Sequence, residues 1–407
     1  MAGYTLAGAS AILKEYVLPA AREQLNNATE SLKLIEGSTD NVEGQEVVLS
    51  LHVSRNSGVG ARKEGDNLPT AGKQGYVKMR VPMRTAFTGR GNVTIQALKG
   101  VKGGSAIAGV PGVTEMKGLV TDAGMDLNRQ IWGTSNGVIA VCGTTSSSTT
   151  VQLAAATTAT EMRHLWVGRV IDIGTVASPQ SIATEREITA VDTTNLTITI
   201  SGAAVTTSST SRIYVAGAGG ASADQREMTG LQTIVASSGS LYGVDPATYN
   251  TWASTYNTAG SNRTPTEALF EKANDDVVIA SGMEVDVVFT THGVVRGYAA
   301  TLVSNKRFSN TQTLPGGFGS GISFASGGRD IPLVRERDVP LNSAWGLNLS
   351  HVRRALWSDG LEYVDEDGAV LSRVPNQLGY EFTAFSMQEL YTDRRNCHFV
   401  MDKLTES

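Results

Sequence analysis

Two glycine-rich stretches contain the residue types that nucleotide-binding loops use. Residues 317–321 are Gly-Phe-Gly-Ser-Gly, but a dinucleotide loop needs its third glycine one residue later, where Ile322 stands, and no helical pattern follows. Gly58-Val-Gly60 precedes Lys63 but lacks the Gly-Lys-Ser/Thr ending that holds a phosphate. We therefore predict flexible turns at both places and expect no nucleotide cofactor.

The histidines and acidic residues show no pattern of metal ligation or catalysis. The five histidines have no metal-ligand spacing and no His-Glu-x-x-His motif; they are His52, His164, His292, His351 and His398. The acidic run at residues 365–367, followed by Gly368, is typical of a solvated turn, not of a calcium loop. No Gly-x-Ser-x-Gly nucleophile motif occurs. The sequence predicts a protein that is not an enzyme and has neither catalytic residues, cofactor nor metal.

Three lysines could support one covalent reaction. Lys63, Lys73 and Lys78 lie in a segment predicted to project as a hairpin. A lysine there can form an isopeptide bond with a neighbouring asparagine if a carboxylate deprotonates it. The alternative is that these lysines are solvated and steer assembly, and we favour it because surface lysines prefer water.

The lysines belong to a basic segment that follows an acidic one. Residues 1–46 contain seven acidic and three basic residues, with a helical pattern over residues 10–27 that Pro19 interrupts. Residues 47–98 form two extended runs around a turn-rich tip, which predicts a long hairpin. Residues 50–90 carry eight basic and two acidic residues. A two-stranded hairpin is marginal alone in water, so we expect it to lie on another surface, such as another subunit.

The strongest helical period lies between residues 112 and 133. Apolar residues recur there at steps of three or four, and they are Val113, Met116, Val120, Ala123, Leu127 and Ile131. Thr114 is expected to cap the start, and Gly133 to end the helix in a left-handed conformation. Gly118 and Gly124 suggest close approach of another backbone. A helix of about 30 Å would form a spine for the other parts.

The remaining segments differ in their patterns. Residues 134–227 alternate short apolar runs with Ser/Thr-rich turns, which predicts a small barrel or sandwich inserted into the chain. Residues 228–360 have a mixed α/β pattern, including a capping box at residues 264–267. Residues 361–404 contain three apolar runs, which we expect to return to the spine helix and cover its apolar face.

Length and composition set further limits. The chain of 407 residues is long enough for two or three domains. A net charge of −5 excludes a basic nucleic-acid-binding protein. Cys142 and Cys397 lie 255 positions apart, which favours two buried thiols in a reducing compartment. No apolar run is long enough to span a membrane and no secretory signal is found, so we expect synthesis and folding in cytoplasm.

Several short motifs occur together along the chain. The hairpin contains 58–62 (Gly-Val-Gly-Ala-Arg), 68–72 (Leu-Pro-Thr-Ala-Gly) and 81–84 (Val-Pro-Met-Arg). The spine contains 115–117 (Glu-Met-Lys) and 127–133 (Leu-Asn-Arg-Gln-Ile-Trp-Gly), and later come 286–290, Pro332-Leu333 with Pro340, and 393–396 (Asp-Arg-Arg-Asn). In this combination the sequence resembles the tailed-bacteriophage major capsid protein family, which has the Hong Kong 97 fold. The resemblance covers most of the chain except residues 134–227.

The resemblance implies an α+β Hong Kong 97-type capsid fold with an added β-barrel-like insertion. The implied parts are an N-terminal arm (1–46), an extended loop (47–98), a peripheral domain (99–133 and 361–407), the insertion (134–227) and an axial domain (228–360). The implied function is a major capsid protein that self-assembles into pentamers and hexamers of an icosahedral phage head, maturing from a procapsid. Such a shell would assemble in the host cytoplasm and enclose double-stranded DNA through non-specific contacts.

The resemblance also implies partners. Besides copies of itself, these are a portal, a possible decoration protein and a separate scaffolding protein, since no scaffolding segment is visible in the sequence. We expect basic residues of the hairpin to contact acidic residues of a neighbouring subunit. The candidate contact residues are Arg55, Arg62, Lys63, Glu64, Lys73, Lys78, Arg84, Asp122 and Asp126.

Two alternative functions remain open. One is an encapsulin-like nanocompartment shell, against which the insertion argues. The other is a virion decoration protein or adhesin, which a Ser/Thr-rich β module would suit.

Overall fold

The computed structural model describes residues 28–40, 42–83, 86–100, 111–155, 157, 161–219, 225–302, 322–358, 360–365 and 370–406. The helical pattern at residues 10–27, the glycine-rich stretch at 317–321, most of the acidic run at 365–367 and Arg84 lie outside these ranges. The chain divides into two compact units. One comprises 1–28, 88–125 and 361–385, and the other comprises 29–87, 126–360 and 386–407.

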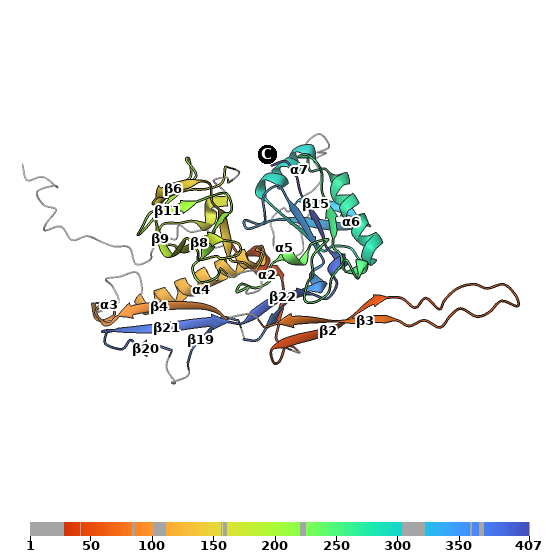
Figure 1. The fold of residues 1–407 in the computed structure, drawn as a ribbon, viewed down its shortest axis with the longest axis horizontal. Helices are drawn as coiled ribbons and strands as arrows, with labels where there is room; N and C mark the ends of the chain where they lie inside the picture. The colour runs from red at the N-terminus through yellow and green to blue at the C-terminus, as the bar shows by residue number, and fades with distance from the viewer. Residues whose placement is uncertain are drawn as a thin grey trace, which may run out of the picture. The chain divides into compact units, whose positions relative to one another are not determined.

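A six-stranded mixed sheet forms the centre of the larger unit. Its order is β13 (Thr255–Asn257), β23 (Phe399–Met401), β17 (Ala344–Leu347), β14 (Val287–Thr290), β16 (Arg329–Arg335) and β15 (Ile322–Ser326). All four residues of β14 are buried, which explains its uninterrupted apolar run. α6 (Glu267–Ser281) and α7 (His292–Leu302) pack on this sheet through a core that includes Phe270, Tyr298 and Phe324 (Figure 1).

The last strand of the chain lies in this central sheet. β23 pairs in parallel with β13 and antiparallel with β17. Residues 399–401 were expected to cover the spine helix within a peripheral segment 361–407, but the structure places them between two strands of the mixed sheet. The sequence pattern could not indicate this position, because a three-residue apolar run fits any sheet that has an open edge.

A second core of the larger unit holds the arm and the hairpin. It surrounds the three-stranded sheet of β1 (Gly37–Ser38), β18 (Val352–Leu356) and β22 (Gln388–Thr392), next to α2 (Glu30–Leu34) and α5 (Leu231–Ile234). Trp132 lies edge-on to Phe289 and Trp345, with ring centroids 5.6 and 5.8 Å apart. Ile35 of the arm is buried in the same core. The described part of the arm therefore packs on its own chain.

The predicted hairpin is present. β2 (Glu46–Ser54) pairs antiparallel with β3 (Gly75–Pro82), and residues 55–74 form a tip that extends away from the rest of the unit (Figure 1). Val47, Leu51, Met79 and Val81 alternate on one face and reach the second core, while the other face is exposed. The chain then continues into β4 (Phe87–Thr94), which pairs with β21 (Gly379–Ser386) instead of extending the hairpin.

The predicted insertion is a separate β module in the larger unit. Its strands are β5 (Val138–Val141), β6 (Thr145–Ser148), β7 (Thr150–Gln152), β8 (Val170–Thr175), β9 (Ala183–Asp192), β10 (Thr197–Ile200), β11 (Val205–Thr207) and β12 (Ser211–Val215). Six of them form a sheet in the order β5-β12-β8-β9-β10-β7, and β11 pairs with β6. Ile173, Ile188, Ile198 and Ile213 are fully buried in a core of its own.

The insertion is not a closed barrel. The two edge strands β5 and β7 are joined only by an isolated bridge between Cys142 and Leu153. β6 leaves this edge and forms a separate two-stranded ribbon with β11, so no continuous ladder closes the sheet. The ends of the insertion lie side by side, because the N–H of Val215 donates to the carbonyl of Gly137 over 3.1 Å.

The smaller unit contains the first part of the spine helix and a sheet. β21 pairs with β4, β19 (Glu362–Tyr363) and β20 (Ser372–Arg373), and a short helix α3 (Ile95–Gly100) follows β4. The spine helix is α4 (Pro111–Ile131). The Tyr363 hydroxyl donates to the carbonyl of Met116 over 3.0 Å, so strands that follow residue 360 do pack on α4.

The ends and glycines of α4 differ from expectation. The helix begins at Pro111, so Thr114 lies inside it and does not cap it. Gly133 does not adopt a left-handed conformation. The Gly133 N–H donates to the Gln130 carbonyl over 3.0 Å, which tightens the last turn of α4, and the first left-handed residue after the helix is Ser135. A Cβ at Gly118 or Gly124 would meet no atom of another described segment within 4 Å, so neither glycine serves a close approach within the described part of the chain.

Candidate functional site

The hairpin tip, residues 55–74, presents most of the predicted contact residues. At its end, the Lys63 N–H donates to the Asp66 carboxylate and the Asp66 N–H to the Lys63 carbonyl, both over 3.1 Å. Gly65 takes φ +86°, which an L side chain rarely adopts. The tip is therefore closed by a defined turn that leaves its charged side chains in solvent.

The structure brings six of the nine predicted contact residues onto the hairpin. All six are exposed, and they are Arg55, Arg62, Lys63, Glu64, Lys73 and Lys78. Among the described residues, no ion pair involves a basic side chain of the tip. Asp122 is exposed on α4 in the smaller unit. Arg84 lies outside the described residues.

Asp126 is engaged within its own chain. Its carboxylate accepts two bonds from Arg129, at 2.9 and 3.1 Å, and lies 3.4 Å from Arg169. Burial alone would raise the pKa of Asp126, but the two arginines hold it well below the usual range. A carboxylate already paired twice has little to offer a neighbouring hairpin, so its position favours a structural role.

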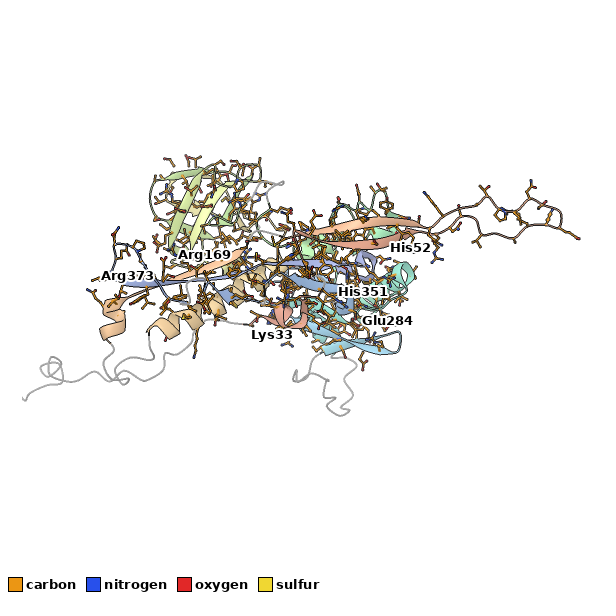
Figure 2. All side chains as sticks on the ribbon, turned by 90° about the horizontal axis from the view of Figure 1, so that it is seen from below. Lys33, His52, Arg169, Glu284, His351 and Arg373 are labelled. Carbon is orange, nitrogen blue, oxygen red and sulfur yellow. The ribbon has the colours of Figure 1, made fainter. Side chains whose placement is uncertain are left out.

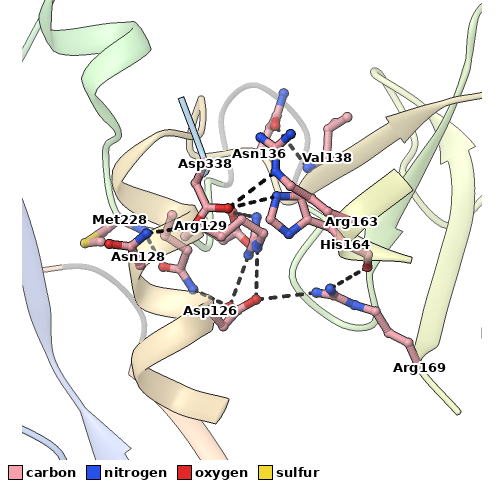
Figure 3. Close-up of polar contacts among 12 residues, drawn as sticks. Asp126, Asn128, Arg129, Asn136, Val138, Arg163, His164, Arg169, Met228 and Asp338 are labelled. Atoms are coloured by element: carbon pink, nitrogen blue, oxygen red, sulfur yellow. Dashed lines mark hydrogen bonds and ion pairs between the residues drawn. The ribbon is translucent and has the colours of Figure 1, made fainter. Parts of the chain in front are cut away.

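Asp126 belongs to a buried polar cluster that the sequence analysis did not recognise. We name it the polar junction, and Figure 3 shows most of it. It comprises Asp126, Asn128, Arg129, Arg163, His164, Arg169, Glu227, Glu336 and Asp338. These residues come from the end of α4, from the insertion and from the segment after β16.

Arg129 is the central cation of the polar junction. It donates to Asp126 and, through two nitrogens, to Glu227, which is 4% exposed. Burial would lower the pKa of Arg129, but these two carboxylates raise it above its ordinary value. The arginine therefore remains charged and ties α4 to the chain segment that leaves the insertion.

Asp338 is the second anchor of the polar junction. It accepts a 2.7 Å bond from Asn128 and lies 3.4 Å from Arg163 and 3.5 Å from His164, both of the insertion (Figure 3). Burial and the surrounding arginines lower the pKa of His164 well below its ordinary value. The histidine is therefore neutral at pH 7, and the insertion is held by hydrogen bonds and arginine charges.

The polar junction also fixes the arm. The N–H and the hydroxyl of Ser31 donate to Glu336 over 2.9 and 2.7 Å, and the Trp132 indole donates to the Ser31 hydroxyl over 2.8 Å. The motif at residues 127–133 contains three consecutive polar residues between Leu127 and Ile131, and the structure buries all three, Asn128, Arg129 and Gln130, at the end of α4. Sequence spacing gave no sign of the partners of these residues, which are up to 210 residues away in the chain.

The polar junction has no arrangement suited to catalysis. Its charges are opposed by charges of the other sign, and it lacks an activated nucleophile with a base. In the described part of the chain, no group of three His, Cys, Asp or Glu side chains could hold a metal ion. None of the described helices is long and apolar enough to cross a membrane.

The hairpin, the long α4, the strands on it and the mixed sheet with two helices are elements of the α+β fold of Hong Kong 97-type capsid proteins, the fold that the sequence resemblance implied. No protein-family model matches the sequence, and no curated protein is similar to it. Solved structures, however, share the fold over the whole chain.

Two solved capsid structures illustrate this similarity, and a third structure aligns less well. In the capsid of cyanophage A-1(L), 99% of this chain aligns with 100% of the other at a TM-score of 0.61 and 15% identity. In the capsid of a native GTA particle, both chains are covered fully at a TM-score of 0.50 and 11% identity. The holo-SrpI encapsulin of Synechococcus elongatus PCC 7942 aligns over 99% of this chain and 96% of its own, with 7% identity, but its TM-score of 0.44 is too low to support an argument.

Proposed function

We propose that this chain is a major capsid protein that self-assembles into pentamers and hexamers of an icosahedral phage head. The observation that carries the proposal is the full-length match to the cyanophage A-1(L) capsid chain. The match leaves only 1% of this chain unaligned, so the shared fold is not confined to one domain.

The hairpin tip supports a role in assembly. Val59 and Leu68 are 85% and 87% exposed there, next to the exposed bases Arg62 and Lys63. Exposed apolar side chains on a projecting segment gain no stability in an isolated subunit, but they do when another surface covers them. In a shell, every copy would supply both the tip and the surface that receives it.

The net charge of the chain supports the proposal that the shell encloses DNA. A net charge of −5 fits a wall that confines double-stranded DNA without binding it tightly. A scaffolding protein and a portal would direct closure, with assembly in the host cytoplasm and a final location in the virion. The role is structural, since the strong buried charges of the polar junction serve to hold segments together.

Electron microscopy of the purified chain tests this proposal. We expect rings of five or six subunits, tubes or closed shells, together with a matching high-mass species in light scattering. A variant in which residues 56–73 are replaced by a short Gly-Ser turn keeps β2 and β3, and we expect it to fold but to form no such particles. A folded wild-type chain that stays monomeric at every concentration and ionic strength would contradict the proposal.

A further inference from the structure

A cleft runs along one side of β2 in the larger unit. Its volume is about 470 Å³, and one wall is formed by the five consecutive residues 49–53. A cleft over the face of a strand would be lined by alternate residues, because side chains alternate. Consecutive lining residues show that the cleft follows the edge of β2. Among the described residues this edge has no ladder, since β2 pairs there only with β3.

The register of the hairpin shows which backbone groups point into the cleft. The Met83 N–H donates to the Gln45 carbonyl over 2.8 Å, which makes these two residues a hydrogen-bonded pair. Bonded pairs alternate along an antiparallel ladder, so Val48, Ser50 and His52 direct their N–H and C=O groups away from β3. Arg80 supports this assignment, because it lies opposite Val48 and its N–H donates outward to Tyr242.

The wall of the cleft that faces β2 contains an acidic side chain and a hydrogen-bond donor without a partner among the described residues. The Asp393 side chain is 47% exposed, and its Oδ1 lies 2.6 Å from Nδ1 of His351. Figure 2 labels His351 and, on β2, His52. Arg394 also lines the cleft, but its guanidinium donates to the Ser281 carbonyl and to Met283 at the end of α6. The Trp252 indole N–H is buried beside the cleft and has no hydrogen-bond partner among the described residues.

We propose that this cleft receives the hairpin tip of a second copy of the chain, which adds to β2 as an extended strand. The inference rests on the proposed function and names the surface on which the tip lies. Main-chain hydrogen bonds to Ser50 and His52 would hold the strand, as in other cases of strand addition to a sheet edge.

Three features select the tip as the occupant. The leg at residues 55–62 contains no proline and belongs to no ladder among the described residues. Its Gly58 N–H donates to the Asn56 side chain over 2.7 Å and its Ala61 carbonyl accepts from Arg62, so strand addition would use the other main-chain groups of the leg. The tip has four bases against two acids, which complements the exposed charge of Asp393. A chain cannot fill its own cleft, because its tip begins directly after β2 and leads away from the unit (Figure 1).

Disulfide trapping between copies tests the inference. Copies carrying only Ser50→Cys are assembled with copies carrying only Val59→Cys, and the particles are oxidised and analysed without reductant. The native thiols will not interfere, since Cys142 and Cys397 are buried and burial raises the pKa of both to about 12. We expect covalent dimers that need both variants. The matched control pairs Val59→Cys with Thr189→Cys, an exposed position of the insertion, and should give none.

A backbone substitution provides a second measurement. Ser50→Pro removes an N–H that points into the cleft and takes no part in the ladder with β3, whereas Ser50→Ala keeps it. We expect Ser50→Pro to lower the particle yield at least tenfold with an unchanged unfolding midpoint, and Ser50→Ala to assemble normally. If wild-type particles form but no dimers are trapped and Ser50→Pro assembles normally, the inference is wrong and the proposed function stands. If the wild-type chain forms no particles, the proposed function itself fails.

Discussion

At the scale of single residues, Arg395 shows how a buried cation holds backbone in this chain. It is 1% exposed, and its guanidinium donates to the carbonyls of Thr233, Ile234, Ser238 and Gly239 over 2.8 to 3.2 Å. Burial lowers its pKa to about 10, so it stays charged at neutral pH. The side chain closes the loop after α5 with bonds that the loop cannot make to itself.

Replacing Arg395 by lysine should therefore weaken this loop. Lysine keeps the charge but not the planar fork, so most of the four bonds are lost. We expect Arg395→Lys to lower the free energy of unfolding by roughly 2–4 kcal/mol, measured by urea denaturation. Arg353→Lys, at an exposed position of β18, should change it by less than about 0.5 kcal/mol. Equal effects of the two substitutions would refute the role given to Arg395.

We expect His398 to make the stability of the subunit depend on pH. It accepts the Asn348 N–H at Nδ1 over 3.2 Å and lies 3.0 Å from the Thr392 hydroxyl at Nε2. Burial lowers its pKa to about 3, below the value of about 6.5 expected in the unfolded chain. The unfolded chain therefore binds more protons between these values, and stability falls as the pH drops from 6.5 towards 3.

The substitution His398→Gln should remove this dependence. At pH 4.5 the histidine costs the wild type about 2–3 kcal/mol relative to pH 7, and glutamine, which does not titrate, costs nothing. Chemical denaturation at both pH values measures the difference. We expect the loss on acidification to be smaller by that amount in His398→Gln and unchanged in His52→Gln, an exposed control. Parallel pH profiles of the wild type and His398→Gln would show that His398 is not responsible.

At the scale of elements, the insertion has the properties of an independent domain. Its core contains only residues 139–213, and its two ends meet at Gly137 and Val215. We expect residues 136–218 expressed alone to give a β-type circular dichroism spectrum and to melt cooperatively. Ile198→Asp places a charge in the centre of this core and should abolish the transition. A wild-type fragment without cooperative melting would mean that the polar junction is needed for the insertion to fold.

The polar junction should couple the insertion to α4. Arg129→Met leaves the buried Glu227 and the partly buried Asp126 without their main cation, and we expect a loss of roughly 3–5 kcal/mol in the free energy of unfolding. Asp126→Asn and Glu227→Gln, added to Arg129→Met, remove the unpaired charges and should recover much of this loss. Urea denaturation compares the single and triple variants, and a triple variant as unstable as the single one would contradict the explanation.

The elements that the sequence predicted share a local signal. The hairpin, α4, the helix that the capping box indicated (α6) and the strands of the insertion follow from apolar periods and turn residues within a single segment. Pairings between distant segments could not be obtained in this way. β23 enters a sheet whose other strands lie far earlier in the chain, and β4 leaves the hairpin for β21, because burial in the folded chain decides these pairings.

The same distinction applies to the candidate sites. The basic residues of the tip could be proposed as contact residues because a charge run in a turn-rich segment is visible locally. Asp126 was proposed as a contact for a neighbour's hairpin on its charge alone, and its partners within the chain, Arg129 and Arg169, could not be recognised from the sequence, Arg169 being in the insertion. The free edge of β2 depends on which strand pairs with β3 and on what lies beside it. Neither fact is contained in the hairpin sequence.

At the scale of the whole molecule, small free-energy contributions from surface contacts become important because each subunit of an assembly repeats them. One exposed ion pair contributes about 0–1 kcal/mol and is screened over about 8 Å at physiological salt. An assembly of many copies sums such terms over every interface, with strand addition and apolar burial in addition. Tip charge should therefore affect assembly strongly and the stability of the subunit hardly at all.

Reversing the tip charge tests this argument. Arg62→Glu with Lys63→Glu changes the tip from net positive to net negative, and we expect a lower particle yield with a strong dependence on salt. The urea midpoint should stay within about 0.5 kcal/mol of wild type, because both side chains are exposed. Arg62→Glu with Glu64→Arg keeps the net charge of the tip and should assemble nearly as well as wild type. Light scattering across a salt series measures both variants, and normal assembly of the double glutamate variant at low salt would exclude an electrostatic contribution from the tip.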